Sequence, residues 1–212
     1  MNSMETLLSV PVEKRDTPWE IDFFNIFVNS KLNVLSPDPQ VGPDNWPYLM
    51  TEWTTESTES VQKIIHWLHD KGIGLVVNPT KDYPDYVFSY GMIWSFKESG
   101  FFYKTTDNIK NGVLEIKENS NCFYGAPNEE YLPKYARQIL KDFFRDQGLL
   151  NVKILMISTD SKFFDFAISI ESLGNPPISE HEGIAEAISW FLPPHYSILL
   201  ISQNNLPPFV DL

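Results

Sequence analysis

The apolar residues of this chain fall into short runs and helical stripes, and this patterning limits the fold more than any other feature. The C-terminal part shows it best, with an amphipathic helix, two strand-sized runs around a Thr-Asp-Ser-Lys turn, a second helix and a last strand. These elements cover, in order, residues 132–148, 152–158, 164–171, 179–191 and 196–201. The pattern predicts an α-β-β-α-β order.

The N-terminal part mixes helices and strands in the same way. Thr17-Pro18-Trp19-Glu20 predicts a helix start, with Thr17 as the cap and Glu20 closing a capping box. A second helix is expected over 56–71, because its apolar residues follow helical spacing. Three strands are expected in addition, over residues 73–77, 86–94 and 112–117, the second with period-two alternation.

We therefore expect an α+β protein with helices packed on one side of one or more mixed or mostly antiparallel sheets. The polar stretch 118–127 is the candidate boundary. It separates an N-terminal α+β region, 1–125, with a Pro-rich loop and an aromatic-rich strand, from the α-β-β-α-β region, 126–212. One continuous domain is the alternative.

Charge and cysteine content exclude several classes of protein. The chain has 28 acidic and 16 basic side chains, a formal net charge of −12. Such a chain does not offer the basic surface that nucleic acid or an anionic membrane requires. The single cysteine, Cys122, excludes an intrachain disulfide. The apolar runs are too short to cross a bilayer, so we expect a cytoplasmic protein that does not associate with a membrane.

The motifs of common catalytic and cofactor sites are missing from the sequence. There is no G-x-S-x-G nucleophile elbow and no Walker-type G-K-[ST]. His66 and His69 are three residues apart on a predicted helix, but zinc needs three or four ligands. We therefore predict no catalytic residue, no cofactor and no metal site. His66 and His69 are the weak candidates for metal ligands.

Aromatic side chains are interspersed with acidic ones in the first half of the chain. Residues 36–60 in this half contain no lysine or arginine. Aromatic rings beside carboxylates suit the recognition of a cationic or apolar partner. The alternative is that the aromatic face of the predicted 86–94 strand belongs to the core. The candidate partner-binding residues are Trp46, Trp53, Tyr83, Asp85, Tyr86, Tyr90 and Trp94.

The C-terminal part resembles the C-terminal domain of SseB-family bacterial proteins. The resemblance covers about Tyr131 to Phe209 and lies in the order of a long helix, the hairpin VKILMIS and FDFAISIE, a short helix, and HYSILLIS with a proline-phenylalanine tail. It implies a cytoplasmic binding or regulatory module and supplies no catalytic residue. The segments GIGLVVNP and DYVFSYGMIW also resemble stretches of bacterial proteins of unassigned function.

These observations favour a non-catalytic, acidic binding module of bacterial type that recognises a basic protein partner in a regulatory or immunity-like role. One alternative is a small hydrolase or metal-dependent enzyme with a site at His66 and His69. Another alternative is a structural component of a larger assembly.

Overall fold

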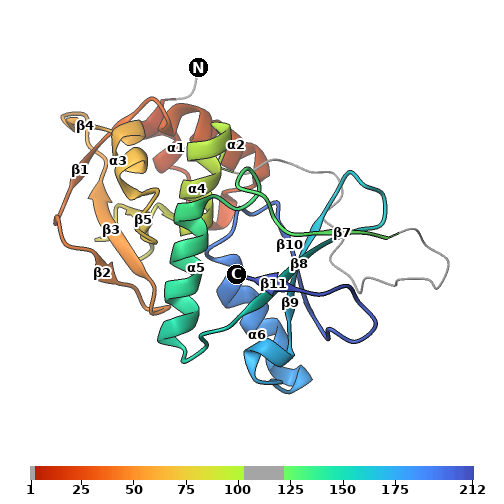
Figure 1. The fold of residues 1–212 in the computed structure, drawn as a ribbon. Helices are drawn as coiled ribbons and strands as arrows, with labels where there is room; N and C mark the ends of the chain where they lie inside the picture. The colour runs from red at the N-terminus through yellow and green to blue at the C-terminus, as the bar shows by residue number, and fades with distance from the viewer. Residues whose placement is uncertain (1–2, 103–121) are drawn as a thin grey trace. The chain divides into compact units, whose positions relative to one another are not determined.

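The structure, a computed structural model, describes residues 3–102 and 122–212 (Figure 1). It divides into two compact units, Met1–Phe102 and Tyr103–Leu212. Helices and mixed sheets confirm the α+β class. The predicted boundary at 125 falls inside the second unit, because strand β7 (Phe123–Gly125) pairs with β8 (Lys153–Ser158). The strand predicted over 112–117 lies outside the described residues.

The first unit combines four α-helices and one 3-10 turn with a mixed sheet of order β4-β1-β3-β5-β6, to which β2 adds beside β3. The strands β3 and β5 run parallel, and the other pairs are antiparallel. The elements are α1 (Met4–Leu8), η1 (Val12–Lys14), α2 (Thr17–Phe27), β1 (Lys31–Val34), β2 (Gln40–Val41), β3 (Pro47–Glu52), β4 (Glu59–Ser60), α3 (Val61–Leu68), β5 (Gly74–Val77), β6 (Tyr86–Phe88) and α4 (Tyr90–Ser99).

The core of the first unit joins side chains of all four helices to one face of this sheet. Stacked aromatic rings connect α2 to β6: Phe23 lies 5.0 Å from Tyr86 and Phe27 lies 4.8 Å from Phe88, centroid to centroid. Such ring pairs add about 0.5–1.5 kcal/mol each to the hydrophobic gain. The wide apolar surface of α2 is therefore used in packing.

The single long strand predicted over 86–94 is wrong in its second half. The strand stops at Phe88, and α4 begins at Tyr90 after Ser89, whose side chain accepts a hydrogen bond from the Met92 amide. Buried residues then follow helical spacing at Tyr90, Ile93 and Trp94. Over so short a stretch, a run of large apolar residues fits both the two-residue period of a strand and the period of about 3.6 residues of a helix. The serine cap favours the helix.

Two predicted helix starts also differ in the structure. Asp16, not Thr17, caps α2, since its carboxylate accepts from the Trp19 amide at 3.0 Å. The helix α6 (Ile178–Ser189) begins one residue before Ser179, after Pro177, and has no side-chain cap. Proline before the first turn sets the backbone there without a hydrogen bond.

Residues 122–212, the described part of the second unit, form two α-helices, one 3-10 turn and a sheet of order β10-β9-β8-β11, with β7 also beside β8. The predicted hairpin of β8 and β9 is confirmed as an antiparallel pair, whereas β10 lies parallel to β9. Besides β7, β8 and α6, the elements are α5 (Lys134–Asp146), β9 (Asp165–Ser169), η2 (Glu171–Leu173), β10 (Ser197–Ile201) and β11 (Val210–Asp211).

The C-terminal tail covers part of one face of this sheet. Phe209 and Leu206 pack on a cluster of Leu155, Ile157 and Ala167. Leu199 and Ile201 of β10 pack against the same cluster. The tail thus replaces a helix as the cover of these strands.

Two glycines make a matched test of packing in the two units. A Cβ at Gly74 would lie 2.6 Å from the Phe88 carbonyl oxygen and 2.6 Å from the Tyr48 ring. We expect Gly74→Ala to lower the free energy of unfolding by about 1–3 kcal/mol. Gly183 lies within α6 with nothing near its missing Cβ, so Gly183→Ala should raise stability by about 0.5–1 kcal/mol. Urea unfolding of both variants measures these changes, and equal effects would contradict the packing described.

Candidate functional site

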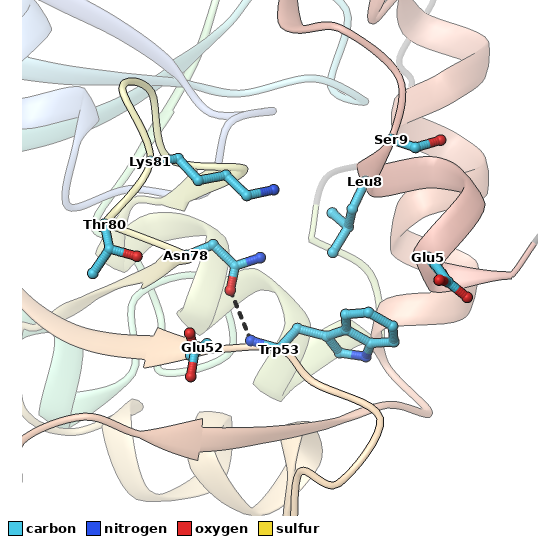
Figure 2. Close-up of a pocket in the computed structure, with 8 residues that line it drawn as sticks. All are labelled: Glu5, Leu8, Ser9, Glu52, Trp53, Asn78, Thr80 and Lys81. Carbon is cyan, nitrogen blue, oxygen red and sulfur yellow. Dashed lines mark hydrogen bonds between the residues drawn. The ribbon is translucent and has the colours of Figure 1, made fainter.

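A pocket of about 340 Å³ opens beside the carboxyl ends of β3 and β5 in the first unit (Figure 2). Trp53 directly follows β3 and Asn78 directly follows β5, and the end of α1 lies opposite. Ligand sites in open sheets with parallel strands lie outside these carboxyl ends. The lining residues are Glu5, Leu8, Ser9, Glu52, Trp53, Asn78, Thr80 and Lys81.

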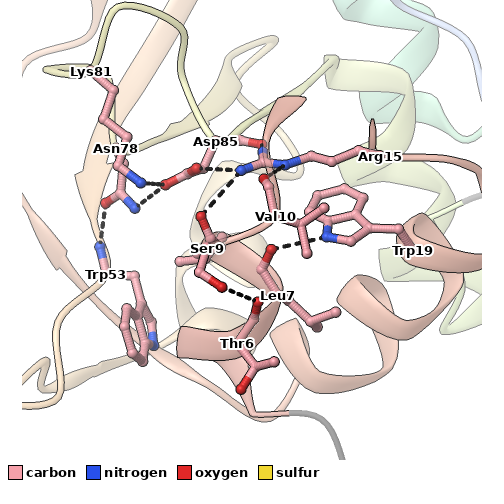
Figure 3. Close-up of polar contacts among 11 residues, drawn as sticks. Thr6, Leu7, Ser9, Val10, Arg15, Trp19, Trp53, Asn78, Lys81 and Asp85 are labelled. Carbon is pink, nitrogen blue, oxygen red and sulfur yellow. Dashed lines mark hydrogen bonds and ion pairs between the residues drawn. The ribbon is translucent and has the colours of Figure 1, made fainter. Parts of the chain in front are cut away.

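A buried carboxylate, Asp85, lies behind this pocket and binds three donors (Figure 3). Its Oδ1 accepts from Arg15 Nη2 at 2.8 Å. Its Oδ2 accepts from Asn78 Nδ2 at 2.6 Å and from Lys81 Nζ at 2.5 Å. The side chain of Asp85 is only 2% exposed and that of Arg15 only 8%. Burial of this charge is tolerated because both carboxylate oxygens are engaged.

Arg15 joins the N-terminal segment to the loop between β5 and β6. Its guanidinium also donates to the backbone carbonyls of Val10, at 2.9 Å, and of Asp85, at 2.6 Å. The same group lies 4.6 Å from the centre of the Trp19 ring. The Trp19 indole N–H in turn donates to the Leu7 carbonyl at 3.0 Å. The planar guanidinium suits this role because its donors point in fixed directions.

Asn78 connects the Asp85 cluster to the pocket wall. Its Oδ1 accepts from the Trp53 backbone N–H at 2.8 Å, while its Nδ2 donates to Asp85. Its backbone has φ of 56°, a left-handed conformation that asparagine adopts more readily than most residues. The Trp53 backbone is therefore tied to the Asp85 cluster through one amide side chain, while the Trp53 side chain packs against the core.

The pKa of Asp85 lies below its ordinary value of 3.8. Burial acts to raise this pKa, but the hydrogen bonds from Asn78, Lys81 and Arg15 together outweigh it. Asp85 is therefore ionised at neutral pH, and its role is to hold the segments around it.

The structure separates the seven predicted partner-binding residues. Trp53 lines the pocket, and Asp85 is linked to it through Asn78. Tyr83 is 71% exposed in the loop before Asp85 but is not part of the lining. Tyr90 and Trp94, at 0% and 2% exposure, belong to the core.

The two remaining aromatic candidates also lie away from the lining. Trp46 is half-buried in the turn between β2 and β3, where its amide donates to Asp44. Tyr86 is half-buried in the aromatic packing of α2, and its hydroxyl donates to Glu20.

The rings of His66 and His69 stack at 5.2 Å at the end of α3, and His69 Nδ1 lies 2.6 Å from the His66 carbonyl oxygen. Within residues 3–102 and 122–212, no group of three or more His, Cys, Asp or Glu is placed to hold a metal ion. In the same ranges, no helix has the length and apolar content to span a membrane.

Comparison with known proteins found no matching family model, curated protein or solved structure. The resemblance to the SseB family stays a prediction.

The sequence indicated Asp85 and Trp53 but not the residues that hold them. Arg15 is distant in sequence, although it is the only arginine before Arg137. Asn78 lies between a buried strand and a proline, where an extended backbone is expected, so its left-handed conformation could not be read from the sequence. No local signal pairs either residue with Asp85.

Removal of the Asp85 charge should destabilise the first unit. Asp85→Asn leaves the buried Arg15 guanidinium without its counter-charge, which costs about 3–5 kcal/mol in comparable pairs. Urea unfolding followed by fluorescence measures the change. Asp82→Asn, exposed in the same loop, is the control and should change stability by less than about 0.5 kcal/mol. Equal effects of the two variants would contradict the role given to Asp85.

The same carboxylate predicts a pH dependence. Because its pKa is lower in the folded protein, Asp85 stabilises the fold above its ordinary pKa, and this contribution is lost as pH falls below 3.8. We expect the stability difference between the wild type and Asp85→Asn to be constant from pH 5 to 7 and to shrink below about pH 4. Unfolding curves across this range test it. A difference that grows toward acid pH would contradict the assignment.

Proposed function

We propose that the chain is a binding module whose first unit receives a basic side chain of a protein partner in the Trp53 pocket. The observation that carries the proposal is that Trp53 and two acidic residues, Glu5 and Glu52, line one pocket. An aromatic face attracts a cation, and nearby carboxylates add directed hydrogen bonds to it.

The charge around the pocket favours a cation. Lys81 is the basic residue of the lining, and its ammonium is bound to Asp85 at 2.5 Å. Glu5 and Glu52 therefore leave a net negative charge, and residues 36–60 add Asp and Glu without any Lys or Arg. A basic partner would be attracted over a distance, at a rate that falls with salt.

The Asp85 cluster supports binding better than catalysis. Its carboxylate oxygens are occupied by Arg15, Asn78 and Lys81, and its pKa is lowered. A general base that works near neutral pH needs a raised pKa and a free oxygen. What the cluster supplies instead is a fixed position for Asn78, and through it for Trp53.

An arginine-rich peptide and its citrulline analogue, which has the same shape without the charge, test the proposal. We expect the arginine peptide to shift the Trp53 indole N–H signal in NMR spectra in a saturable way, and the citrulline peptide to leave it unchanged. Trp53→Phe identifies the signal. Glu52→Gln should weaken binding about two- to fivefold, as expected for the loss of one partly exposed charge contact.

Glu182→Gln is the matched control, because it removes the same charge from an exposed position in the second unit. It should leave the affinity unchanged. Equal shifts with both peptides, or equal weakening by Glu52→Gln and Glu182→Gln, would contradict recognition at the Trp53 pocket.

A further inference from the structure

The strand β10 differs from the other edge strands of the two sheets in length. It is five residues long and forms one edge of the second sheet. The edge strands β4 and β6 have two and three residues, and β11 has two, with Asp211 paired to Lys153 at 2.7 Å. Short length and charge are the usual protections of an edge, and β10 has neither.

The sequence around β10 carries no charged side chain. Residues 187–210 contain no Asp, Glu, Lys or Arg, in a chain of net charge −12. All five residues of β10 are half-buried, and Ile198, Leu199, Leu200 and Ile201 are apolar. Within the part of the chain that the structure describes, β9 is the only strand that pairs with β10.

Among the described residues, no strand pairs with the outer edge of β10, and the backbone groups that point there follow a known order. The Ile201 carbonyl accepts from the Ile170 N–H at 3.0 Å, so it points toward β9. Because the N–H and C=O groups of successive residues alternate between the two edges of a strand, those of Ile198 and Leu200 point away from β9. These two residues are ready to pair with another strand.

We propose that β10 pairs antiparallel with β10 of a second copy of this chain, about a two-fold axis at Leu199. In this register the whole strand lies beside its copy. Ile198 of each copy lies opposite Leu200 of the other copy, which gives two such pairs. Each of these pairs exchanges two hydrogen bonds. Leu199 then faces its own copy in a non-hydrogen-bonded pair.

Charge selects a second copy as the occupant. Two acidic copies repel each other over most of their surfaces, whereas residues 187–210 bring no charged side chain to the approach. The Glu171 carboxylate, which lies just past the end of β10, accepts hydrogen bonds from Ser202 and Gln203 of the same chain. A basic partner gains no electrostatic attraction there. The pairing is independent of the Trp53 pocket, which lies in the other unit.

A single introduced cysteine tests the register. In a Cys122→Ser background, Leu199→Cys places two thiols across the axis, where Cα atoms of a non-hydrogen-bonded pair are about 4.5 Å apart, within disulfide range. We expect mild oxidation to give a disulfide dimer on a non-reducing gel. Ile201→Cys, on the same strand and face, is opposite Ser197 of the other copy and should cross-link at least tenfold more slowly. Equal cross-linking at both positions overturns the proposed pairing.

The mass in solution tests the association itself. Light scattering should give twice the chain mass of 24.5 kDa for the wild type. Leu200→Pro removes an outward N–H and leaves the pairing with β9 in place, so it should give the single-chain mass with an unchanged circular dichroism spectrum. A wild-type protein that stays at the single-chain mass at high protein concentration overturns the proposal.

Discussion

The carboxylate of Asp85 is the buried charge on which the first unit depends. It binds the guanidinium of Arg15 from the N-terminal segment, and the amide of Asn78 and the ammonium of Lys81 from the segment between β5 and β6. Removal of any one donor leaves a buried charge less well matched, which is why such clusters act as a unit. Through Arg15 the cluster fixes the N-terminal segment, and through Asn78 it fixes Trp53.

The two units use charge in opposite ways. In the first unit, carboxylates and an indole ring line a pocket at the ends of parallel strands, a combination suited to a cation. In the described part of the second unit, the edge strand β10 carries no charged side chain and pairs with a strand on one side, a surface suited to another strand. The charged side chains behind the net charge of −12 are therefore unevenly distributed along the chain. Residues 187–210 contain no Asp, Glu, Lys or Arg.

Elements specified by local pattern could be predicted, whereas long-range pairs could not. The stripe of α5 and the turn between β8 and β9 define those elements within a few residues. The segment from Tyr86 to Trp94 fits both periods, so its division between β6 and α4 depends on the Ser89 cap. Asp85 was a candidate because it lies among aromatic residues, but its pairing with Arg15 spans 70 residues of chain and leaves no local pattern.

Hydrogen exchange in the Asp85→Asn variant tests most directly whether this cluster fastens the N-terminal segment. We expect faster exchange of amides in and directly after α1, such as those of Leu7 and Ser9, and unchanged protection in α5 of the second unit. The α3 amides should keep most of their protection, because α3 packs through apolar contacts of its own. Unchanged exchange in α1, or an equal loss of protection in α1 and α3, would contradict this role of Asp85.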